Sequence, residues 1–459
     1  MNQHITGFFQ SLKGKHIAVC GVGKNNTPVI RQLLGAGAVV TACDKRSREA
    51  IGDTITVLEQ EGAVFQLGEN YLSGIDSMDM ILRTPGMKPY LPEFEAARKK
   101  GVTVTSEMEL FFELCPASIF AVTGSDGKTT TTTIIAKLLE KAGHTVHLGG
   151  NIGRPLLPII EKITPTDLAV IELSSFQLTM MTQSPHVGVI TNIAPNHLDW
   201  HTDMQEYTDA KKNLIAHQKA GDRAVINADN AVTASFAEVS RGQTCFFSRQ
   251  KPVEEGAFLG ENGKLYYQSG GHKTEIMTAD EIKLPGVHNI ENYLAAITAV
   301  WGYVSPQQIR EFAMEFGGVP HRCELVTTRN GVRWYNDSIG TSPSRTIAGL
   351  KAFDRKVILI AGGYDKHIPY APLGEVVPET VKTAILLGAT ADKIEAAIRE
   401  HADLPIVRVA SMEEAVETAD RLAREGDIVF MSPASASFDM YKNFEERGEH
   451  FKRVVENLL

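Results

Sequence analysis

Short apolar runs alternate with stretches of helix length along almost the whole chain. The runs "KHIAVCGVG" (15–23), "VVTACDKR" (39–46) and "MDMILRTPGM" (78–87) have the composition of strands, and each contains or ends in turn-forming or charged residues. This alternation is typical of domains in which helices flank a mostly parallel sheet. The pattern therefore predicts an α/β fold.

The alternation stops and starts again at two places. The first interruption is "CPASIF" (115–120) and the second is "FGGVPHRCE" (316–324), where glycine and proline break the pattern. We therefore predict three α/β domains: a Rossmann-like N-terminal domain (1–116), a central domain with the parallel sheet of a phosphate-loop ATPase (117–318), and a Rossmann-like C-terminal domain (319–459). A chain of 459 residues suffices for three domains, at roughly 100–200 residues per domain.

One part of the central domain has a different pattern. Residues 242–285 contain "TCFFS", "GAFLGENGKLYYQSGG" and "KTEIM", short β-rich runs with Asn-Gly and Gly-Gly pairs among them. Such pairs are typical of tight hairpin turns. We expect these runs to form a small β appendage of hairpin strands, followed by a helix at 286–304.

Composition and charge narrow the class of protein. Hydrophobic residues make up 43% of the chain and charged residues 22%, which is an ordinary globular profile. The net charge of −9 argues against a duplex nucleic-acid binder, which would normally present a basic face. Local lysines and arginines can still hold small anionic ligands. We therefore expect no nucleic-acid partner.

Cysteine usage and the distribution of apolar residues bear on cellular location. The five cysteines are sparse and unpatterned, which is typical of a reducing compartment. Residues 1–16 lack a long apolar core after a basic start, so we expect no signal peptide. Because no apolar run approaches the ~18 residues of a membrane span, we expect a cytoplasmic protein without a membrane partner.

The stretch "VTGSDGKTT" joins a predicted strand to a predicted helix. Backbone N–H groups at a helix start attract phosphate oxygens, Lys128 adds a positive charge, and the Thr129 hydroxyl can ligate Mg²⁺. The standard pattern places a glycine five positions before Gly127, where this chain has Val122, so the loop is a shorter version. The sequence predicts a phosphate site here, with an ordinary glycine-rich turn as the alternative.

Polar side chains follow two later predicted strands of the central domain. Glu172 comes at the end of "DLAVIEL", and the carboxyl end of a parallel strand faces the crevice where ligands bind in such sheets. We predict a second Mg²⁺ ligand at Glu172, with a solvated glutamate as the alternative. For His197 in "NHLDWH", metal binding and a structural role both stay open. Lys211 and Lys212 in "EYTDAKKNL" have the pattern of a solvated basic helix face.

The first predicted turn of the chain resembles a dinucleotide fingerprint in part. Its glycines are Gly21 and Gly23, but the third position, which should be Gly or Ala, is Asn26. Asp44 ends the second predicted strand about 20 residues further on, where an acid would take a ribose hydroxyl, and Arg46 could meet phosphate or base. The pattern favours a nucleotide-like ligand that is not specifically NAD, with a plain turn as the alternative.

Motifs spread in order over essentially the whole chain resemble the Mur ligase family. They are "VTGSDGKTTTT", "GGNIG", "ELSSFQL", "NIAPNHLDWH", "YTDAKK", "LPGVHNIENYLAA", "GVPHRCE", "NDSIGTSP", "GGYDK" and "SPASASFDMYKNFEERGEHF". The resemblance is greatest to the members that join D-glutamate to UDP-N-acetylmuramoyl-L-alanine, a cytoplasmic step of peptidoglycan precursor synthesis. It implies a three-domain, ATP-dependent amide ligase in which ATP phosphorylates a carboxylate and an amine displaces the phosphate. It also implies two Mg²⁺ sites, and we expect a monomer.

The same resemblance assigns roles to individual residues. It implies catalytic roles for Lys128, Glu172, His197 and Lys211, with Lys211 carrying a carbamate, which overturns the solvated interpretation of that lysine. The implied metal ligands are Thr129, Glu172, His197 and Lys211. The implied ATP site consists of Gly124, Ser125, Asp126, Gly127, Lys128, Thr129, Thr130, Asn289, Asn292, Arg322 and Asp337. The implied UDP-substrate site consists of Lys24, Asp44, Arg46, Gly86, Asn151 and His197, and the implied D-glutamate site of Thr341, Lys366, Ser437 and Phe444.

The chain departs from the family pattern at a few positions, and other classes are less well supported. Ile339 stands where some relatives carry lysine, and Asp126 where asparagine or histidine is common. The segment "GGYDKHIPY" disfavours a ligase that adds diaminopimelate or lysine. Asn26 argues against a dinucleotide-dependent oxidoreductase, and the absence of the base-reading Asn-Lys-x-Asp motif argues against a phosphate-loop switch protein.

Overall fold

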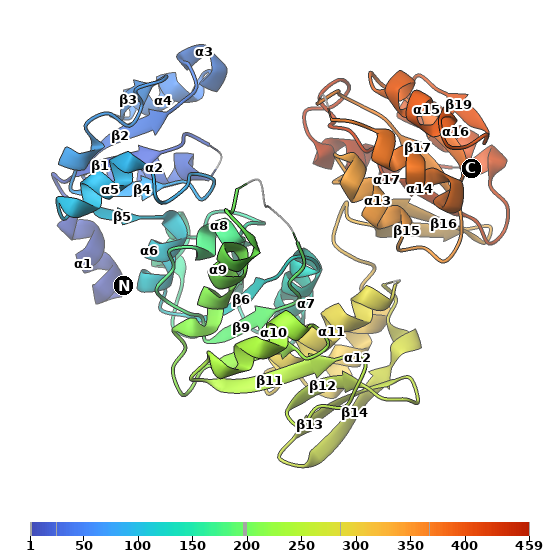
Figure 1. Ribbon diagram of the computed structural model, residues 1–459, viewed down its shortest axis with the longest axis horizontal. Coiled ribbons are helices and arrows are strands. Elements are labelled where there is room, and N and C mark those ends of the chain that lie inside the picture. The colour runs from blue at the N-terminus through green and yellow to red at the C-terminus, as the bar shows by residue number, and fades with distance from the viewer. Residues whose placement is uncertain (1, 24, 196–199, 285, 367, 459) are drawn as a thin grey trace. The chain divides into compact units, whose positions relative to one another are not determined.

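The computed structural model describes residues 2–23, 25–195, 200–284, 286–366 and 368–458. These residues form three sheets of five, nine and six strands, each with its own helices (Figure 1). They divide into two compact units, Met1–Ala279 with Ile290–Phe312 (unit 1) and Asp280–Asn289 with Ala313–Leu459 (unit 2). The predicted α/β class is confirmed. The predicted domain borders remain predictions, because this division joins the first two sheets in one unit.

The first sheet is parallel throughout, in the order β3-β2-β1-β4-β5, which is the Rossmann-like arrangement predicted for the N-terminal domain. Its strands are β1 (His16–Cys20), β2 (Val39–Asp44), β3 (Val64–Leu67), β4 (Met80–Arg83) and β5 (Thr103–Thr105). The helices of this part are α1 (Gln3–Ser11), α2 (Asn26–Gly35), α3 (Arg48–Ile51), α4 (Thr54–Gln60), η1 (Ile75–Ser77), α5 (Pro92–Lys99) and α6 (Glu107–Leu114). Cys20, the last residue of β1, lies opposite Cys43 in the parallel β1–β2 pair. The turn after β1 therefore lies beside the end of β2.

The second sheet has the order β14-β13-β12-β11-β10-β9-β6-β8-β7 and is parallel from β7 to β12. Its strands are β6 (Ser118–Thr123), β7 (Val146–Gly150), β8 (Leu168–Glu172), β9 (Val187–Ile190), β10 (Arg223–Asn227), β11 (Gln243–Ser248), β12 (Gly256–Leu259), β13 (Lys264–Ser269) and β14 (His272–Thr278). The helices are α7 (Lys128–Lys141), η2 (Leu157–Lys162), α8 (Ser175–Leu178), α9 (Met204–Ala216), α10 (Ala231–Ala234), η3 (Ser235–Glu238), η4 (Ala279–Glu281), α11 (Val287–Val300) and α12 (Pro306–Glu315). Because β6 lies between β8 and β9, the segments that follow these three strands meet at one edge of the sheet.

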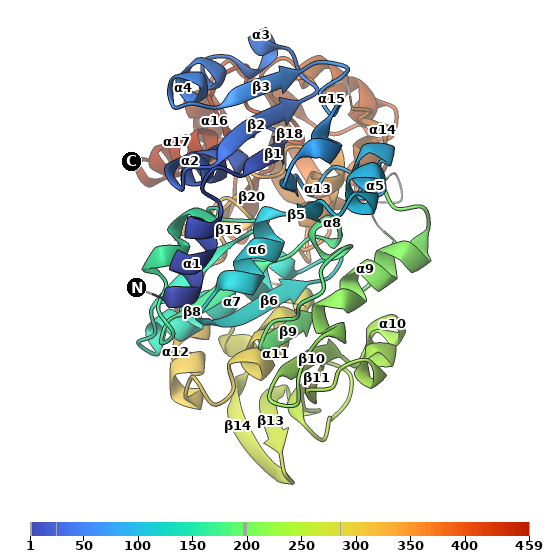
Figure 2. The same cartoon turned by 90° about the vertical axis from the view of Figure 1, so that its left-hand side faces the viewer.

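The predicted β appendage is the continuation of this sheet. Strands β12, β13 and β14 pair in antiparallel fashion, and Figure 2 shows β13 and β14 at the far end of the sheet from β6. The run "TCFFS" differs from the hairpin strand expected for it, because it forms β11, which is parallel to both β10 and β12. The connection from β10 to β11 contains α10 and η3, and a parallel pair requires such a crossover.

The first two sheets share one hydrophobic core. It includes Leu33 of α2 and Leu82 of β4 from the first sheet's side, together with Leu156 and Ile160 beside the second sheet. The half-buried Glu107 accepts, through its carboxylate, hydrogen bonds from the backbone N–H groups of Leu156 (3.2 Å) and Leu157 (3.0 Å). This common core explains why the two sheets belong to one compact unit.

The third sheet has the order β15-β16-β20-β17-β18-β19, with an antiparallel edge pair β15–β16 and parallel pairing elsewhere. Its strands are β15 (Glu324–Arg329), β16 (Val332–Asn336), β17 (Val357–Ala361), β18 (Val381–Leu386), β19 (Ile406–Arg408) and β20 (Ile428–Met431), and its helices are α13 (Pro343–Leu350), α14 (Ala371–Thr380), α15 (Ala391–Arg399), α16 (Met412–Leu422) and α17 (Phe444–Glu456). Apolar clusters cover both of its faces, as in a Rossmann-like domain. Within the described ranges, no helix combines the length and apolar composition needed to cross a membrane.

Candidate active site

The predicted phosphate loop connects β6 to α7, and its shape requires both glycines. Gly124 has a φ of 145°, and a Cβ there would lie 1.8 Å from the Thr191 hydroxyl oxygen. Gly127 has a φ of 76°, and a Cβ there would lie 2.3 Å from Oδ1 of Asn292. L-residues rarely adopt such φ values, so backbone conformation and close neighbours both select glycine at these positions.

Side chains of the loop are held by the loop itself and by the segment after β9. Nζ of Lys128 donates hydrogen bonds to the carbonyl oxygens of Gly124 and Ser125, both at 2.9 Å. The Ser125 hydroxyl lies 2.8 Å from the hydroxyl of Tyr207, and the backbone N–H of Ser125 donates to the Asn192 carbonyl at 2.8 Å. The N–H of Asp126 donates to Oδ1 of Asn192 at 2.9 Å. Asn192 and Tyr207 thus shape the loop, although their residue types gave no sequence signal for this role.

The threonine run at the start of α7 is buried, and the hydroxyl groups of Thr132 and Thr133 bond to the preceding helical turn. Thr132 donates to the Lys128 carbonyl at 2.7 Å, and Thr133 donates to the Thr129 carbonyl at 2.8 Å. Such bonds to the preceding helical turn let a β-branched polar residue lie in a buried helix. Thr129 and Thr130, assigned to the ATP site from sequence, are also buried in this first turn.

Glu172 and Asn151 lie together beside the loop. Glu172 is 1% exposed at the end of β8, and its Oε1 accepts a hydrogen bond of 2.7 Å from Nδ2 of Asn151. Among the described residues, no group donates a hydrogen bond to its buried Oε2. A buried carboxylate with one open oxygen fits the hard oxygen ligand that Mg²⁺ prefers. Asn151, which sequence assigned to the UDP substrate, therefore contacts the predicted metal ligand directly.

Lys211 is buried in the same region. Its side chain is 1% exposed on α9, and Nζ donates to the Gly124 carbonyl at 2.8 Å and to the Thr123 hydroxyl at 3.2 Å. Burial lowers the pKa of Lys211 well below its ordinary value, and the nearby charge of Lys128 lowers it further. The solvated face inferred from pattern alone is therefore wrong for Lys211. A buried amine with a lowered pKa is a nucleophile at neutral pH.

Two residues assigned from sequence, Lys24 and His197, lie outside the described residues. Among the described residues, no three His, Cys, Asp or Glu side chains form a group that could hold a metal. The other three residues assigned to Mg²⁺, Thr129, Glu172 and Lys211, are all buried.

The turn after β1 borders a cavity of about 420 Å³, which lies at the edge of the first sheet where β1 and β2 end. Asp44 and Arg46 form an ion pair of 2.8 Å at its edge. Burial alone would raise the pKa of Asp44, but hydrogen bonds from Arg46 and from the Val22 N–H hold it below its ordinary value. Asn26 also has a clear structural role, because its Nδ2 donates to the Gly21 carbonyl at 2.8 Å and closes the turn. The cavity is lined by Gly21, Val22, Gly23, Asn25, Asn26, Asp44, Lys45, Arg46, Tyr71, Thr84 and Met87.

Of the residues assigned to D-glutamate, Thr341 and Lys366 are neighbours in unit 2. Nζ of Lys366 lies 3.3 Å from the Thr341 hydroxyl oxygen. Burial lowers the pKa of Lys366, and the positive charges of Arg447 and Arg345 add to the effect. Ser437 is buried, and Phe444 begins α17, where its carbonyl accepts a hydrogen bond of 2.7 Å from the Ser338 hydroxyl.

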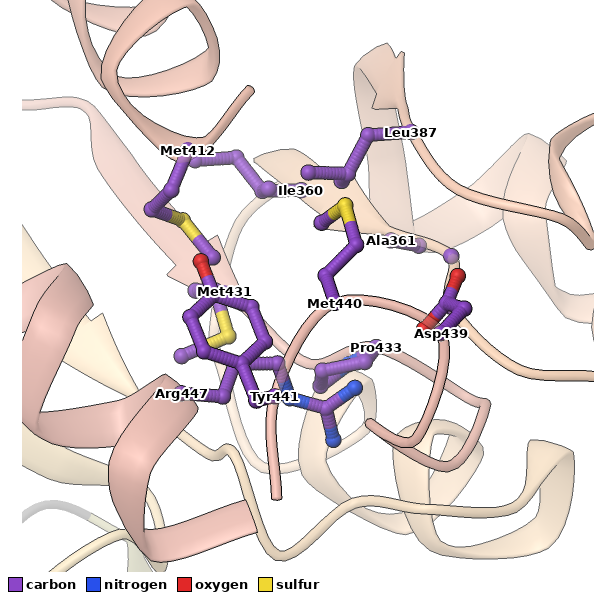
Figure 3. A pocket seen from close by; sticks show the side chains of 12 residues that line it. Ile360, Ala361, Leu387, Met412, Met431, Pro433, Asp439, Met440, Tyr441 and Arg447 are labelled. Carbon is purple, nitrogen blue, oxygen red and sulfur yellow. The ribbon is translucent and has the colours of Figure 1, made fainter. Parts of the chain in front are cut away.

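Arg447 organises the loops around these residues, and sequence reasoning did not identify it. It is 2% exposed and donates to the carbonyls of Ser338 (2.9 Å), Ser435 (3.1 Å) and Ala436 (3.0 Å). Burial lowers its pKa to about 10. Figure 3 shows it beside a cavity of about 10 Å³ that Tyr441 and Met440 also line, which is space for about one water molecule.

The remaining residues assigned to ATP occupy α11 and the start of the third sheet. Asn289 and Asn292 lie one turn apart in α11, and Oδ1 of Asn292 accepts a hydrogen bond of 3.2 Å from the Thr131 hydroxyl. Arg322 lies in the bend before β15, where its N–H donates to the Val319 carbonyl. Asp337 follows β16 and is buried, with Oδ2 accepting a hydrogen bond of 2.7 Å from the Ser432 hydroxyl.

Asp337 gives the stability of unit 2 an expected pH dependence. Burial raises its pKa from 3.8 to about 6. Its bound proton therefore stabilises the fold fully below pH ~4, and this contribution is lost as the pH rises through ~6. Between pH 4 and 7 we expect a loss of about 2 kcal/mol in the free energy of unfolding.

Urea unfolding of the nucleotide-free protein across this pH range measures the effect. Asp337→Asn should remove this share of the pH slope, because the amide does not titrate. Asp392→Asn is the matched control, since that side chain is 96% exposed. Equal slopes in Asp337→Asn and wild type would contradict the expectation.

Comparisons with known proteins agree with this geometry. Three protein-family models match the chain: "Mur ligase MurD-like, N-terminal domain" over residues 15–106, "Mur ligase middle domain" over 122–300 and "Mur ligase, glutamate ligase domain" over 321–435. A UDP-N-acetylmuramoylalanine--D-glutamate ligase of Acetivibrio thermocellus is 51% identical over 100% of both chains. A protein of the same name from Ruminiclostridium cellulolyticum is 49% identical, again over 100% of both.

Solved structures share the fold. The crystal structure of UDP-N-acetylmuramate-alanine ligase from Thermotoga maritima matches with a TM-score of 0.57 and 17% identity, covering 96% of this chain and 99% of that one. A pseudomurein peptide ligase type C from Methanothermus fervidus matches with a TM-score of 0.52 and 20% identity, over 96% and 99% of the two chains. At these identities the likeness establishes the three-domain fold alone.

Proposed function

The chain belongs to the Mur ligase family, and from that premise we propose that it joins D-glutamate to UDP-N-acetylmuramoyl-L-alanine at the expense of ATP. The observation that carries this proposal is the sequence identity to ligases of that name, which is about one half over the full length of both chains. The phosphate loop, with Glu172 and Lys211 beside it, supports the ATP-dependent part. We place the reaction in the cytoplasm, in agreement with the cysteine usage.

The first step of the proposed reaction activates a carboxylate. An oxygen of the substrate's terminal carboxylate attacks the γ-phosphorus of ATP, and ADP leaves. The N–H groups at the start of α7 and the ammonium of Lys128 would hold the phosphates and oppose their negative charge. To reach them, Nζ of Lys128 would exchange its present bonds to the Gly124 and Ser125 carbonyls for phosphate oxygens.

The second step forms the amide. The amine of D-glutamate attacks the carbonyl carbon of the acyl phosphate, the tetrahedral intermediate expels inorganic phosphate, and the amine loses its proton. Lys366 and the Thr341 hydroxyl would bind carboxylates of D-glutamate, since an ammonium and a hydroxyl are suitable donors for them. Ser437 and Phe444 would complete that pocket. Exclusion of water protects the acyl phosphate from hydrolysis.

Metal and carbamate assignments also belong to this proposal. Thr129, Glu172, His197 and a carbamate on Lys211 would hold two Mg²⁺ ions. When bound, Mg²⁺ neutralises charge on the phosphates and polarises their oxygens. The lowered pKa of Lys211 supports the carbamate, because its neutral amine can add to CO₂ and release one proton. Asn151 would keep Glu172 in place, leaving Oε2 for the metal.

The nucleotide of the substrate would occupy the cavity of the first sheet. Lys24, Asp44 and Arg46 would contact it, and the Asp44–Arg46 ion pair already lies at the edge of that cavity. Gly86, Asn151 and His197 would meet its muramoyl part. On the ATP side, Asn289, Asn292, Arg322 and Asp337 would contact adenosine and phosphates.

The decisive test measures ADP release with UDP-N-acetylmuramoyl-L-alanine and one amino acid at a time. We expect release with D-glutamate and at least about a hundredfold less with L-glutamate, L-lysine or diaminopimelate, because a pocket that pairs charged groups rejects a ligand that leaves them unpaired. Omission of the muramoyl nucleotide is the control. Release with lysine or diaminopimelate in place of D-glutamate would overturn the proposal.

A further inference from the structure

Trp200 makes a direct contact between the two sheets of unit 1. Its indole Nε1–H donates a hydrogen bond of 2.9 Å to the carbonyl oxygen of Gly86. Gly86 belongs to the turn after β4, and its neighbours Thr84 and Met87 line the cavity of the first sheet. A side chain of the central domain therefore holds the backbone of a turn that borders the proposed nucleotide site.

The indole is fixed by aromatic neighbours on its own side. Its ring centroid lies 4.6 Å from that of Phe176 and 4.6 Å from that of His201. Phe176 belongs to α8, which begins three residues after Glu172. Stiff rings packed in this way keep one orientation at a low cost in conformational entropy. The donor aimed at Gly86 is therefore positioned in advance.

The same cluster reaches the phosphate loop. His201 is 2% exposed, and its Nε2 lies 2.9 Å from the Ser175 hydroxyl oxygen. Its ring centroid lies 5.3 Å from that of Tyr207, whose hydroxyl lies 2.8 Å from the Ser125 hydroxyl. Packed side chains thus connect Gly86 to Ser125 without interruption. They join the turn at the nucleotide cavity to the loop that would hold ATP.

We propose that Trp200 is a positioning residue that fixes the 84–87 turn relative to the phosphate loop and so couples the binding of the muramoyl nucleotide to the binding of ATP. This inference rests on the proposed function. The two ligands must meet for phosphoryl transfer, and a misplacement of about 1 Å between reacting groups lowers rates strongly. Coupling is a difference between two binding free energies, and the test measures it directly.

The test variant is Trp200→Phe, which keeps an aromatic ring against Phe176 and His201 and removes the N–H donor. We measure the Kd of UDP-N-acetylmuramoyl-L-alanine by calorimetry, with and without a non-hydrolysable ATP analogue, for wild type and variant. In wild type we expect the analogue to tighten nucleotide binding. In the variant we expect the Kd of the muramoyl nucleotide, measured in the presence of the analogue, to rise about 3- to 10-fold, which is the effect of one lost hydrogen bond. The Kd of the analogue itself, measured without the muramoyl nucleotide, should stay within about twofold of the wild-type value.

Trp301→Phe is the matched control. This tryptophan belongs to the same unit and stacks on Tyr267 at a centroid distance of 3.9 Å, within the central domain. It should retain the wild-type coupling. Trp200→Ala, which also removes the packing, should lose at least as much coupling as Trp200→Phe.

Each outcome decides the question. Wild-type coupling in Trp200→Phe or Trp200→Ala overturns the inference, and so does an equal loss of both ligands together with a lower melting temperature. If the wild-type protein binds the muramoyl nucleotide but releases ADP only with another amino acid, the proposed function is wrong. The coupling between the two ligands can still be measured in that case. A wild-type protein that does not bind the nucleotide refutes both.

Discussion

Replacing Lys211 with alanine is expected to lower kcat roughly a thousandfold or more, the scale of losing charge stabilisation at a phosphoryl-transfer site. The amine lies 2.8 Å from the Gly124 carbonyl, in the same loop as Lys128. A carbamate at this position would supply an anion as a metal ligand, whereas an ammonium would repel the cation. Burial favours the neutral amine, which is the form that reacts with CO₂.

Two further variants separate the carbamate from the charge of the lysine. Lys211→Arg keeps a positive charge but cannot form the carbamate, so we expect it to be as inactive as Lys211→Ala. Lys212→Ala is the matched control, because this neighbouring side chain is paired with Asp209 at 2.7 Å at the surface of α9, and its activity should stay within about twofold of wild type. Initial rates of ADP release at saturating substrates provide the measurement. Added bicarbonate should not restore Lys211→Ala, and full activity in that variant would remove Lys211 from the mechanism.

The phosphate loop could be predicted from sequence because its signal is local. A strand, two glycines with special φ values and a helix start are contiguous, and β6, the loop and α7 form as expected. A rule about strand ends predicts that Glu172 lies near the loop, and it does so because β8 pairs directly with β6 and Val122 lies beside Glu172. Where a position depends on neighbours in the chain or on the end of a strand, the sequence was sufficient.

The partners of these residues could not be predicted, because they depend on which strands pair. Asn151 contacts Glu172 because β7 lies beside β8, with Gly150 opposite Glu172. Asn26 weakens a glycine fingerprint in the sequence, yet it closes the same turn through a side-chain hydrogen bond.

Burial was the other property that sequence could not reveal. Lys211 and Lys212 are adjacent and chemically equal, yet Lys211 is 1% exposed and Lys212 is partly solvated. Arg447 has the sequence context of a surface helix, in "NFEERGEHF", but its guanidinium is buried among the carbonyls of two loops. A charged side chain inside a protein requires such partners, and they come from distant parts of the chain.

Replacing Glu172 with glutamine is expected to lower kcat roughly hundredfold and to raise the Mg²⁺ concentration needed for half-maximal activity, because the substitution removes a negative metal ligand while keeping its shape. The amide oxygen can still accept the hydrogen bond from Asn151, so the local structure should persist. The amide nitrogen of the glutamine would then lie where the open oxygen Oε2 lies in wild type.

The structure also predicts how this variant differs from a general defect in folding. A neutral amide is less costly to bury than a carboxylate with an open oxygen, so without Mg²⁺ Glu172→Gln should melt no earlier than wild type. Activity would then fall while stability holds, which a structural role alone would not produce. Glu161→Gln is the control, since that glutamate is exposed in the same domain. Mg²⁺ titrations of ADP release measure the effect, and an unchanged Mg²⁺ dependence with wild-type kcat would show that Glu172 is not a metal ligand.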